Sequence, residues 1–268
     1  MQVNNKTIIV TGAGSGMGRE LTFQLLNKNA TVIGIDINPD SLAETQKLAG
    51  ANATRFKGYT LDISNKEKVE AFAQEVIQAL GAVDGIINNA GIIQPFIPVN
   101  DLNYDQIHRV MNVNFFGTVY LTKAFLPHFL TRPEAHIVNI SSMGGFIPFP
   151  GQTFYGAAKA AVKLFTEGLY AELKNTNVKV TVVHPGAIAT NITTNSGLDM
   201  PKVEPDSKQS QMALPAPKAA AIIIKAMETN KYRATVGKDA RFLDLLYRFN
   251  PRYATNFIQK MMAKRGIV

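Results

Sequence analysis

Short apolar segments alternate with longer amphipathic segments along most of the chain. The shorter runs are rich in β-branched residues and almost continuously apolar: Lys6–Thr11, Thr31–Asp36, Val83–Asn88, His136–Ser141 and Val178–Val183. This pattern is typical of strands that are covered on both faces, as in a parallel sheet. Two weaker strand candidates are Phe56–Leu61 and Ala234–Val236.

The segments between these strands have the periodicity of helices. They are Met17–Lys28, Asp40–Ala49, Lys66–Leu80, Tyr104–Leu130 and Gln152–Asn175. Ser64 followed by Glu67 has the spacing of a capping box and predicts the start of the third helix. Strands and helices that alternate in this way predict an α/β fold with a doubly wound parallel sheet, the Rossmann fold.

The last third of the chain departs from this alternation. Residues 191–217 are polar, contain four prolines and have no clear period, which is typical of a functional lid or a partly disordered segment. Three helix candidates follow: Lys218–Glu228, Arg241–Phe249 and Tyr253–Lys264. We therefore predict a catalytic domain over residues 1–217, with a lid at about 191–217, and a basic helical extension over residues 218–268.

Positive charge is concentrated in that extension. The 268 residues include 28 basic and 20 acidic side chains, a formal net charge of +8, and eleven basic and three acidic ones lie in residues 218–268. The first 217 residues therefore carry no net charge, and no recognition motif accompanies the extension, so we expect no nucleic-acid binding. Its basic amphipathic helices fit an anionic membrane surface, the entrance of a substrate pocket, a sister subunit or simple solvation.

Composition excludes several kinds of chemistry. The chain has no Cys, which excludes disulfides, Cys-ligated zinc and thiol nucleophiles, and its four His have no metal-ligand spacing. The N-terminus has no signal-peptide pattern, and no apolar run approaches the ~18 residues that cross a bilayer. We expect a cytoplasmic protein without a metal site.

A glycine-rich loop joins the first predicted strand to the first predicted helix. Residues 11–18 read Thr-Gly-Ala-Gly-Ser-Gly-Met-Gly. Glycines at such a junction let backbone N–H groups approach a pyrophosphate at the helix N-terminus, although a tight turn alone also uses them. The strand–turn–helix context favours a dinucleotide site.

Asp36 ends the second predicted strand, 18 residues after the last glycine of the loop. A carboxylate there accepts hydrogen bonds from an adenosine ribose and repels a 2′-phosphate, although Asp also opens ordinary turns. Neither Ser15 nor Ile37 is basic, while Arg19 is a nearby cation. These residues favour NAD over NADP.

Tyr155 and Lys159 lie four residues apart, on one face of a predicted helix. A free tyrosine has a pKa of about 10. A neighbouring cation lowers this pKa, so the pair can act as acid or base near neutral pH. The spacing alone also occurs on solvated helix faces, and the rest of the sequence has to support this interpretation.

The motifs together resemble those of the short-chain dehydrogenase/reductase family, in order and in spacing, over about residues 6–190. Besides the glycine loop, Tyr155 and Lys159, the resemblance rests on Asp36, Asp62-Ile63, Asn88-Asn89-Ala90-Gly91, Asn114, Ser142 and Pro185-Gly186. It implies the Rossmann fold in a single domain and hydride transfer between NAD(H) and an alcohol or carbonyl substrate.

The resemblance also implies a catalytic set. Tyr155 would exchange the proton of the substrate oxygen, and Ser142 would hydrogen-bond that oxygen. Lys159 would hold the nicotinamide ribose and lower the pKa of Tyr155, and Asn114 would anchor a water molecule. The neighbouring Ser141 fits the spacing less well, and Asn112 is expected to point the other way around its helix.

A cofactor site follows from the same resemblance. The positions implied to contact the dinucleotide are Gly12, Ser15, Gly16, Met17, Gly18, Asp36, Asp62, Ile63, Asn89, Ala90, Gly91, Tyr155, Lys159, Pro185, Gly186, Ile188 and Thr190. The family also implies a homodimer or homotetramer.

Apolar residues flank the implied catalytic positions. They are Phe96, Met143, Phe146, Phe149 and Phe154, and they indicate an apolar alcohol or ketone, although core packing explains them equally well. A dehydratase or epimerase of the same fold, and a dinucleotide sensor without activity, are the alternatives to the oxidoreductase.

Overall fold

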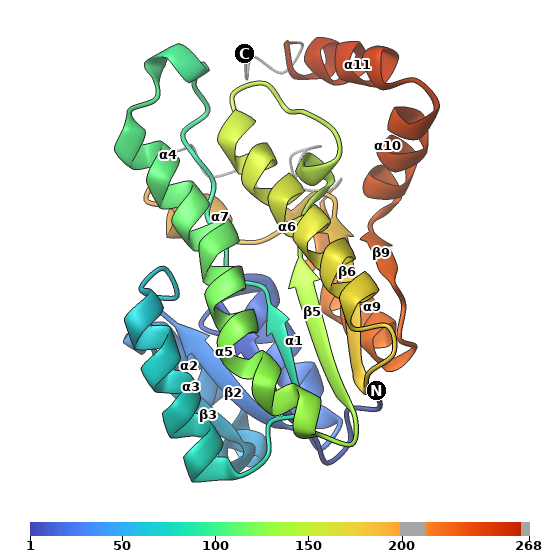
Figure 1. The fold of residues 1–268 in the computed structure, drawn as a ribbon. Coiled ribbons are helices and arrows are strands. Elements are labelled where there is room, and N and C mark those ends of the chain that lie inside the picture. The colour runs from blue at the N-terminus through green and yellow to red at the C-terminus, as the bar shows by residue number, and fades with distance from the viewer. Residues whose placement is uncertain (199–212, 264–268) are drawn as a thin grey trace.

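A seven-stranded parallel sheet forms the centre of the computed structural model, which describes residues 1–198 and 213–263. The strand order is β3-β2-β1-β4-β5-β6-β9, and all neighbouring strands are parallel. The strands are β1 (Thr7–Thr11), β2 (Thr31–Asp36), β3 (Phe56–Thr60), β4 (Gly85–Asn88), β5 (Ala135–Ile140), β6 (Val178–Pro185) and β9 (Arg233–Val236). The doubly wound fold expected from the sequence is confirmed (Figure 1).

Helices cover both faces of the sheet. One core cluster holds side chains from α1 (Gly16–Asn27), α2 (Pro39–Leu48) and α9 (Ala216–Glu228), and the other holds side chains from α3 (Lys66–Leu80), α5 (Gly117–Thr131) and α6 (Thr153–Glu172). Within β1, Ile8 and Val10 belong to the first cluster and Ile9 to the second. Burial on both faces explains why the strands are almost continuously apolar. In the part of the chain that the structure describes, no helix combines the length and apolarity that crossing a bilayer requires.

The strand order places a crevice at one edge of the sheet. From β1 the chain continues through β2 to β3 on one side, and β4 then starts the other side next to β1. At such a reversal the two crossover connections leave in opposite directions and leave a crevice at the carboxyl ends of the strands. The motif residues that follow β1, β2, β4, β5 and β6 all lie at this edge.

The third helix starts one residue later than the capping box predicts. Its N-cap is Asn65, whose side chain accepts a hydrogen bond of 2.9 Å from the backbone N–H of Lys68. Ser64 instead donates its hydroxyl to Oδ1 of Asp62, at 2.7 Å. Because Asp62 holds the Ser64 side chain, the next residue caps the helix, and the predicted capping box is wrong.

The sheet extends beyond the division that the sequence suggests at residue 217. α9 packs against α1, and β9 pairs with β6 as the seventh strand. After β9, α10 (Lys238–Phe249) and α11 (Pro251–Ala263) lie outside the layers that cover the sheet (Figure 1). Lys264 and Arg265 of the predicted basic extension lie outside the described residues.

The two ends of the predicted lid meet in a small parallel sheet. β7 (Ile188–Ala189) pairs with β8 (Leu214–Pro215), and the one-turn helix α7 (Ile192–Asn195) follows β7. The middle of the predicted lid, residues 199–212, lies outside the described part of the chain.

Candidate active site

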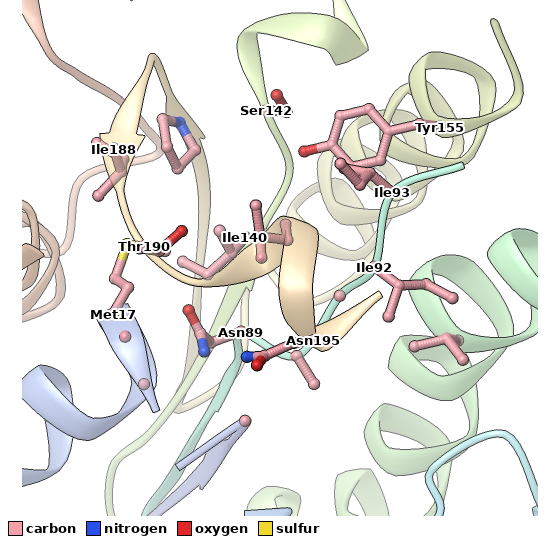
Figure 2. Close-up of a pocket in the computed structure, with 18 of the residues that line it drawn as sticks. Met17, Asn89, Ile92, Ile93, Ile140, Ser142, Tyr155, Ile188, Thr190 and Asn195 are labelled. Carbon is pink, nitrogen blue, oxygen red and sulfur yellow. The ribbon is translucent and has the colours of Figure 1, made fainter. Parts of the chain in front are cut away.

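A cavity of about 1120 Å³ opens at the carboxyl edge of the sheet. Every residue predicted to contact the cofactor lines it, from the glycine loop to Thr190, and so do Ser142, Tyr155 and Lys159. Of the four residues predicted to be catalytic, Asn114 does not line it. Figure 2 shows side chains from the loops after β1, β4, β5 and β6 facing this one space. The volume is large enough for a dinucleotide together with a small second ligand.

The glycine loop forms one wall through backbone alone. Gly12 has a φ of +70°, a conformation that favours glycine. A Cβ on Gly18 would lie 1.9 Å from the carbonyl oxygen of Gly12, so a side chain there would break the turn. Ser15, the N-cap of α1, makes no side-chain capping bond to its helix. The first N–H groups of a helix have no partner within that helix, so this N-terminus beside a glycine wall suits a pyrophosphate.

Asp36, the last residue of β2, places a carboxylate on the cavity wall. Its Oδ2 accepts a hydrogen bond of 2.9 Å from Gly14 N–H, and its Oδ1 accepts one of 3.0 Å from Asn38 N–H. Arg19, the cation that complicated the cofactor prediction, donates to Thr45 and to the carbonyl of Gly14 and pairs with Glu44. Arg19 does not line the cavity, whereas Asp36 does.

Asn89 and Ala90 are fixed directly against the first strand. Both backbone N–H groups donate to the Thr11 hydroxyl, at 2.9 and 2.8 Å, and the Asn89 side chain donates to the Thr11 carbonyl at 2.9 Å. The loop after β4 is thereby held against the glycine loop. Thr11 has this role although the sequence analysis treated it only as the start of the loop.

The Tyr155 hydroxyl points to the side of the cavity that holds Ser142 (Figure 2). Burial raises the pKa of Tyr155, and a hydrogen bond with Ser142 opposes that rise. Ser142 also accepts a hydrogen bond of 3.0 Å from Gly144 N–H. The neighbouring Ser141 donates its hydroxyl to the Lys159 carbonyl at 2.7 Å and is buried. The hydroxyl that interacts with Tyr155 is therefore that of Ser142.

Lys159 is a buried cation at the base of the cavity. Its Nζ donates to the carbonyl oxygen of Ile140 at 3.0 Å, and burial lowers its pKa to about 8. From their spacing, Lys159 is expected to lower the pKa of Tyr155. The structure instead gives a raised pKa for Tyr155, because loss of water around the phenol outweighs the other contributions.

Asn114 lies behind the cavity wall in a π-helical turn at Asn112–Phe116. This turn interrupts the single helix predicted over Tyr104–Leu130. The Asn114 side chain accepts from Ile92 N–H and donates to the Ile92 carbonyl, both at 2.8 Å. Asn112 is exposed to solvent, on the other side of the helix from the buried Asn114, as expected. A π-turn is often found at functional sites because it redirects one side chain out of helical register.

Comparison with known proteins agrees with this geometry. The model of the short chain dehydrogenase family matches residues 6–201. SadH of Mycobacterium tuberculosis, whose name assigns it to the oxidoreductases, is 40% identical over 250 residues, 91% of this chain and 90% of SadH. The chain belongs to the short-chain dehydrogenase/reductase family.

Solved structures of this family share the fold and differ in the cofactor they hold. A short-chain dehydrogenase/reductase of Burkholderia phymatum in complex with NAD has a TM-score of 0.79 and 26% identity, over 88% of this chain and 90% of that chain. A short chain dehydrogenase of Burkholderia cenocepacia in complex with NADP has a TM-score of 0.79 and 25% identity, over 96% and 99%. This chain is therefore an oxidoreductase with an NAD(P)-binding fold.

Gln94 is a further site residue of this short-chain dehydrogenase/reductase, and its role is not predicted from the sequence. It is buried, and its side-chain oxygen accepts from the backbone N–H groups of Phe154 and Tyr155, at 2.8 and 3.1 Å. Its side-chain nitrogen donates to the Gly151 carbonyl at 3.0 Å. Gln94 thus caps the helix that carries Tyr155 from a loop some 60 residues earlier, and a lone Gln in a loop gives no signal of this in the sequence.

The described start of the predicted lid is tied down across the cavity. Asn195 donates to the Ser15 hydroxyl at 2.8 Å, and the Ser196 hydroxyl accepts from Ile93 N–H at 2.9 Å. Arg109, which also lines the cavity, donates to the Ser196 carbonyl at 3.3 Å. α7 is therefore bonded both to the glycine loop and to the loop after β4.

The wall beside Tyr155 is mostly apolar. Phe96, Met143 and Phe149 line it as expected from their positions, but Phe146 and Phe154 do not. Phe146 packs edge-on against a buried histidine in the core beneath the C-terminal helices. Gln152 adds one polar group to this wall, and its side-chain oxygen is buried without a hydrogen-bond partner among the described residues.

Proposed function

We propose that this protein is an NAD-dependent oxidoreductase that interconverts an apolar alcohol and its carbonyl compound, with Tyr155 as the general acid and base. One observation supports the proposal best. A single cavity joins a side-chain-free glycine wall and the Asp36 carboxylate to the paired hydroxyls of Ser142 and Tyr155.

The residues present fit a bound dinucleotide. The missing Cβ at Gly18 leaves the first turn of α1 open to a pyrophosphate, and any side chain there would collide with Gly12. Asp36 favours NAD, because its carboxylate suits a free ribose diol and repels a 2′-phosphate. Arg19 is already bonded to Glu44 and Thr45, so it is less available to bind a 2′-phosphate.

The chemistry divides between cofactor and protein. When bound, a nicotinamide cofactor would supply the hydride exchange with the substrate carbon. Ser142 donates a hydrogen bond to the substrate oxygen, and Tyr155 gives that oxygen its proton in reduction or takes it in oxidation. Lys159 would hold the nicotinamide ribose, and Asn114, which is bonded to the Ile92 backbone, would anchor a water molecule. Phe96, Met143 and Phe149 exclude water around the reacting carbon.

Replacing Tyr155 with Phe tests the assigned acid and base. The variant keeps the ring but removes the proton donor, so we expect kcat/KM to fall by roughly 10²–10⁴-fold while NADH affinity, measured by fluorescence titration, stays within about twofold. Tyr170→Phe, on the exposed side of α6, is the matched control and keeps full activity. Equal turnover by Tyr155→Phe and wild type would remove Tyr155 from the mechanism.

The Tyr155→Phe variant also separates the proposed enzyme from a dinucleotide sensor. A sensor has no turnover to lose, so neither Tyr155→Phe nor Tyr170→Phe would change its function. A homodimer or homotetramer, as the family implies, and a cytoplasmic location are further proposals.

A further inference from the structure

The C-terminal helices α10 and α11 have two different faces. Their inner face packs into a small core of Leu243, Ala254, Ile258 and Met262 around Ile147. Phe96, Met143 and Phe149, which line the cavity, pack against the same core. The inner face therefore supports the cavity wall. Packing at the substrate pocket is one of the contacts that the sequence suggested for the basic extension.

The outer face of these helices exposes large apolar side chains. We call it the outer aromatic face, and it consists of Phe242, Leu245, Phe249, Tyr253 and Phe257. The rings of Phe242 on α10 and Phe257 on α11 lie 6.2 Å apart, so the two helices present one continuous surface. Phe249, the last residue of α10, is 92% exposed. A contiguous apolar surface of this kind marks a binding site more often than chance exposure does.

Positive charge surrounds this face. Lys238, Arg241, Arg252 and Lys260 are exposed, and none of them forms an ion pair with another described residue. The two acids of α10 are directed to other partners. Asp244 binds Arg233 and Arg248, and burial alone would raise its pKa, but the Arg233 hydrogen bonds and charge lower it.

The second acid, Asp239, accepts a hydrogen bond of 2.7 Å from Ala187 N–H. Ala187 follows the Pro185-Gly186 segment at the cavity, and a Cβ on Gly186 would lie 2.2 Å from the Asp239 carboxylate. Both carboxylates of α10 are thus bonded to other parts of the protein, which leaves the outer surface of the helix positively charged.

We propose that the outer aromatic face docks on the surface of an anionic lipid membrane. Exposed aromatic and leucine side chains enter the interfacial region of a bilayer, and surrounding Lys and Arg bind anionic headgroups. A second copy of the chain is a poorer occupant, because a two-fold contact would set these cations against themselves. α11 also lies toward the carboxyl edge of the sheet, where the cavity opens, so docking brings the cavity near the lipid (Figure 1).

The absence of Trp in the chain provides a direct test. Phe249→Trp places the only indole on the outer aromatic face, and Leu48→Trp places it at the exposed end of α2, as the matched control. Both proteins are titrated with phosphatidylcholine vesicles that contain or lack phosphatidylglycerol. We expect a blue shift for Phe249→Trp only with phosphatidylglycerol, its reversal by salt, and no shift for Leu48→Trp.

Sedimentation of the chain without the Trp substitutions, together with the same vesicles, tests whether the exposed cations contribute to binding. Arg252→Gln and Lys260→Gln should each weaken the partition coefficient about fivefold, whereas Lys57→Gln on β3 should leave it unchanged. Phe249→Ser should weaken it as well. Because these side chains are exposed, the variants fold as the wild type does, and circular dichroism checks this.

Three results would overturn the proposal. One is failure of the wild type to sediment with phosphatidylglycerol vesicles, and another is equal binding to vesicles of phosphatidylcholine alone. The third is dissociation of an oligomer by Phe249→Ser in analytical ultracentrifugation, which would identify the outer aromatic face as a subunit contact. None of these results depends on the identity of the substrate or cofactor.

Discussion

Burial shifts the pKa values of the two central titratable side chains of the cavity in opposite directions. It raises the pKa of Tyr155, and it lowers the pKa of Lys159 to about 8. Both shifts favour the uncharged form, because transfer from water costs a charged group more than a neutral one. In the proposed mechanism, a neutral Tyr155 can donate its proton to a carbonyl oxygen, which suits the reducing direction near neutral pH.

The lowered pKa of Lys159 makes stability depend on pH. Between about pH 8 and the unfolded-state pKa of 10.5, the unfolded chain binds more protons at this residue than the folded chain, so the free energy of unfolding rises with pH. Above pH 10 the raised pKa of Tyr155 acts in the opposite direction. We predict that the free energy of unfolding of Lys159→Met, measured by urea denaturation, rises less steeply between pH 8 and 10 than that of the wild type.

The exposed Lys57→Met is the control and keeps the wild-type dependence. Identical slopes for Lys159→Met and the wild type would mean that the Lys159 ammonium is not buried in the folded protein.

Asp36 combines two roles that a substitution can separate. Asp36→Asn keeps an acceptor for Gly14 N–H but removes the negative charge. We predict that kcat/KM with NADP⁺ then rises and that the preference for NAD⁺ falls about tenfold, which corresponds to ~1.4 kcal/mol. Steady-state rates with both cofactors measure this. An unchanged ratio would show that the charge of Asp36 does not discriminate between the two.

At the scale of elements, two devices position the site. The π-turn at Asn112–Phe116 brings the Asn114 amide onto the Ile92 backbone. Gln94 caps α6 and so fixes the backbone of Phe154 and Tyr155, about one turn before Lys159. Both devices connect the loop after β4 to helices that arrive later in the chain.

Gln94 is the positioning residue that we expect to matter most. Gln94→Leu removes both hydrogen bonds to α6, so we predict a fall in kcat of about 10- to 100-fold with a nearly unchanged KM for NAD⁺. Gln94→Glu keeps the acceptor for the Phe154 and Tyr155 N–H groups and loses only the bond to Gly151, but it adds a negative charge at the start of α6, which raises the pKa of Tyr155 further. It should therefore recover most of the activity and shift the pH profile of alcohol oxidation to higher pH.

A purely structural Gln94 would give a different pattern. Gln94→Leu would then lower the melting temperature without changing kcat, and the pH profile of Gln94→Glu would match that of the wild type.

The sequence could predict what depends on local pattern. The seven strands, their parallel arrangement and the residues at their carboxyl ends follow from short apolar runs and from motifs directly after them. Gln94 could not be predicted, because its partners Phe154 and Tyr155 are some 60 residues away and backbone N–H groups leave no trace in sequence. The direction of the Tyr155 pKa shift depends on burial, which spacing from Lys159 does not reveal.

At the scale of the whole molecule, charge and chemistry occupy different regions. The first 217 residues are neutral overall, and the excess of positive charge belongs to the last 51. The structure assigns part of that stretch, α9 and β9, to the sheet layers and leaves α10 and α11 as a separate pair with an apolar outer face. The molecule thus combines a dinucleotide-binding sheet with a basic helical pair next to the apolar wall of its cavity.

The most direct test of the proposed activity is the initial rate of cofactor reduction with NAD⁺ and with NADP⁺ across apolar secondary alcohols of increasing size. We predict turnover of at least one such alcohol, with kcat/KM for NAD⁺ at least about tenfold above that for NADP⁺, or ~1.4 kcal/mol. A preference for NADP⁺ would contradict the role given to Asp36. Tight NADH binding without turnover of any alcohol or ketone would contradict the oxidoreductase activity proposed for Tyr155 and favour a dinucleotide sensor.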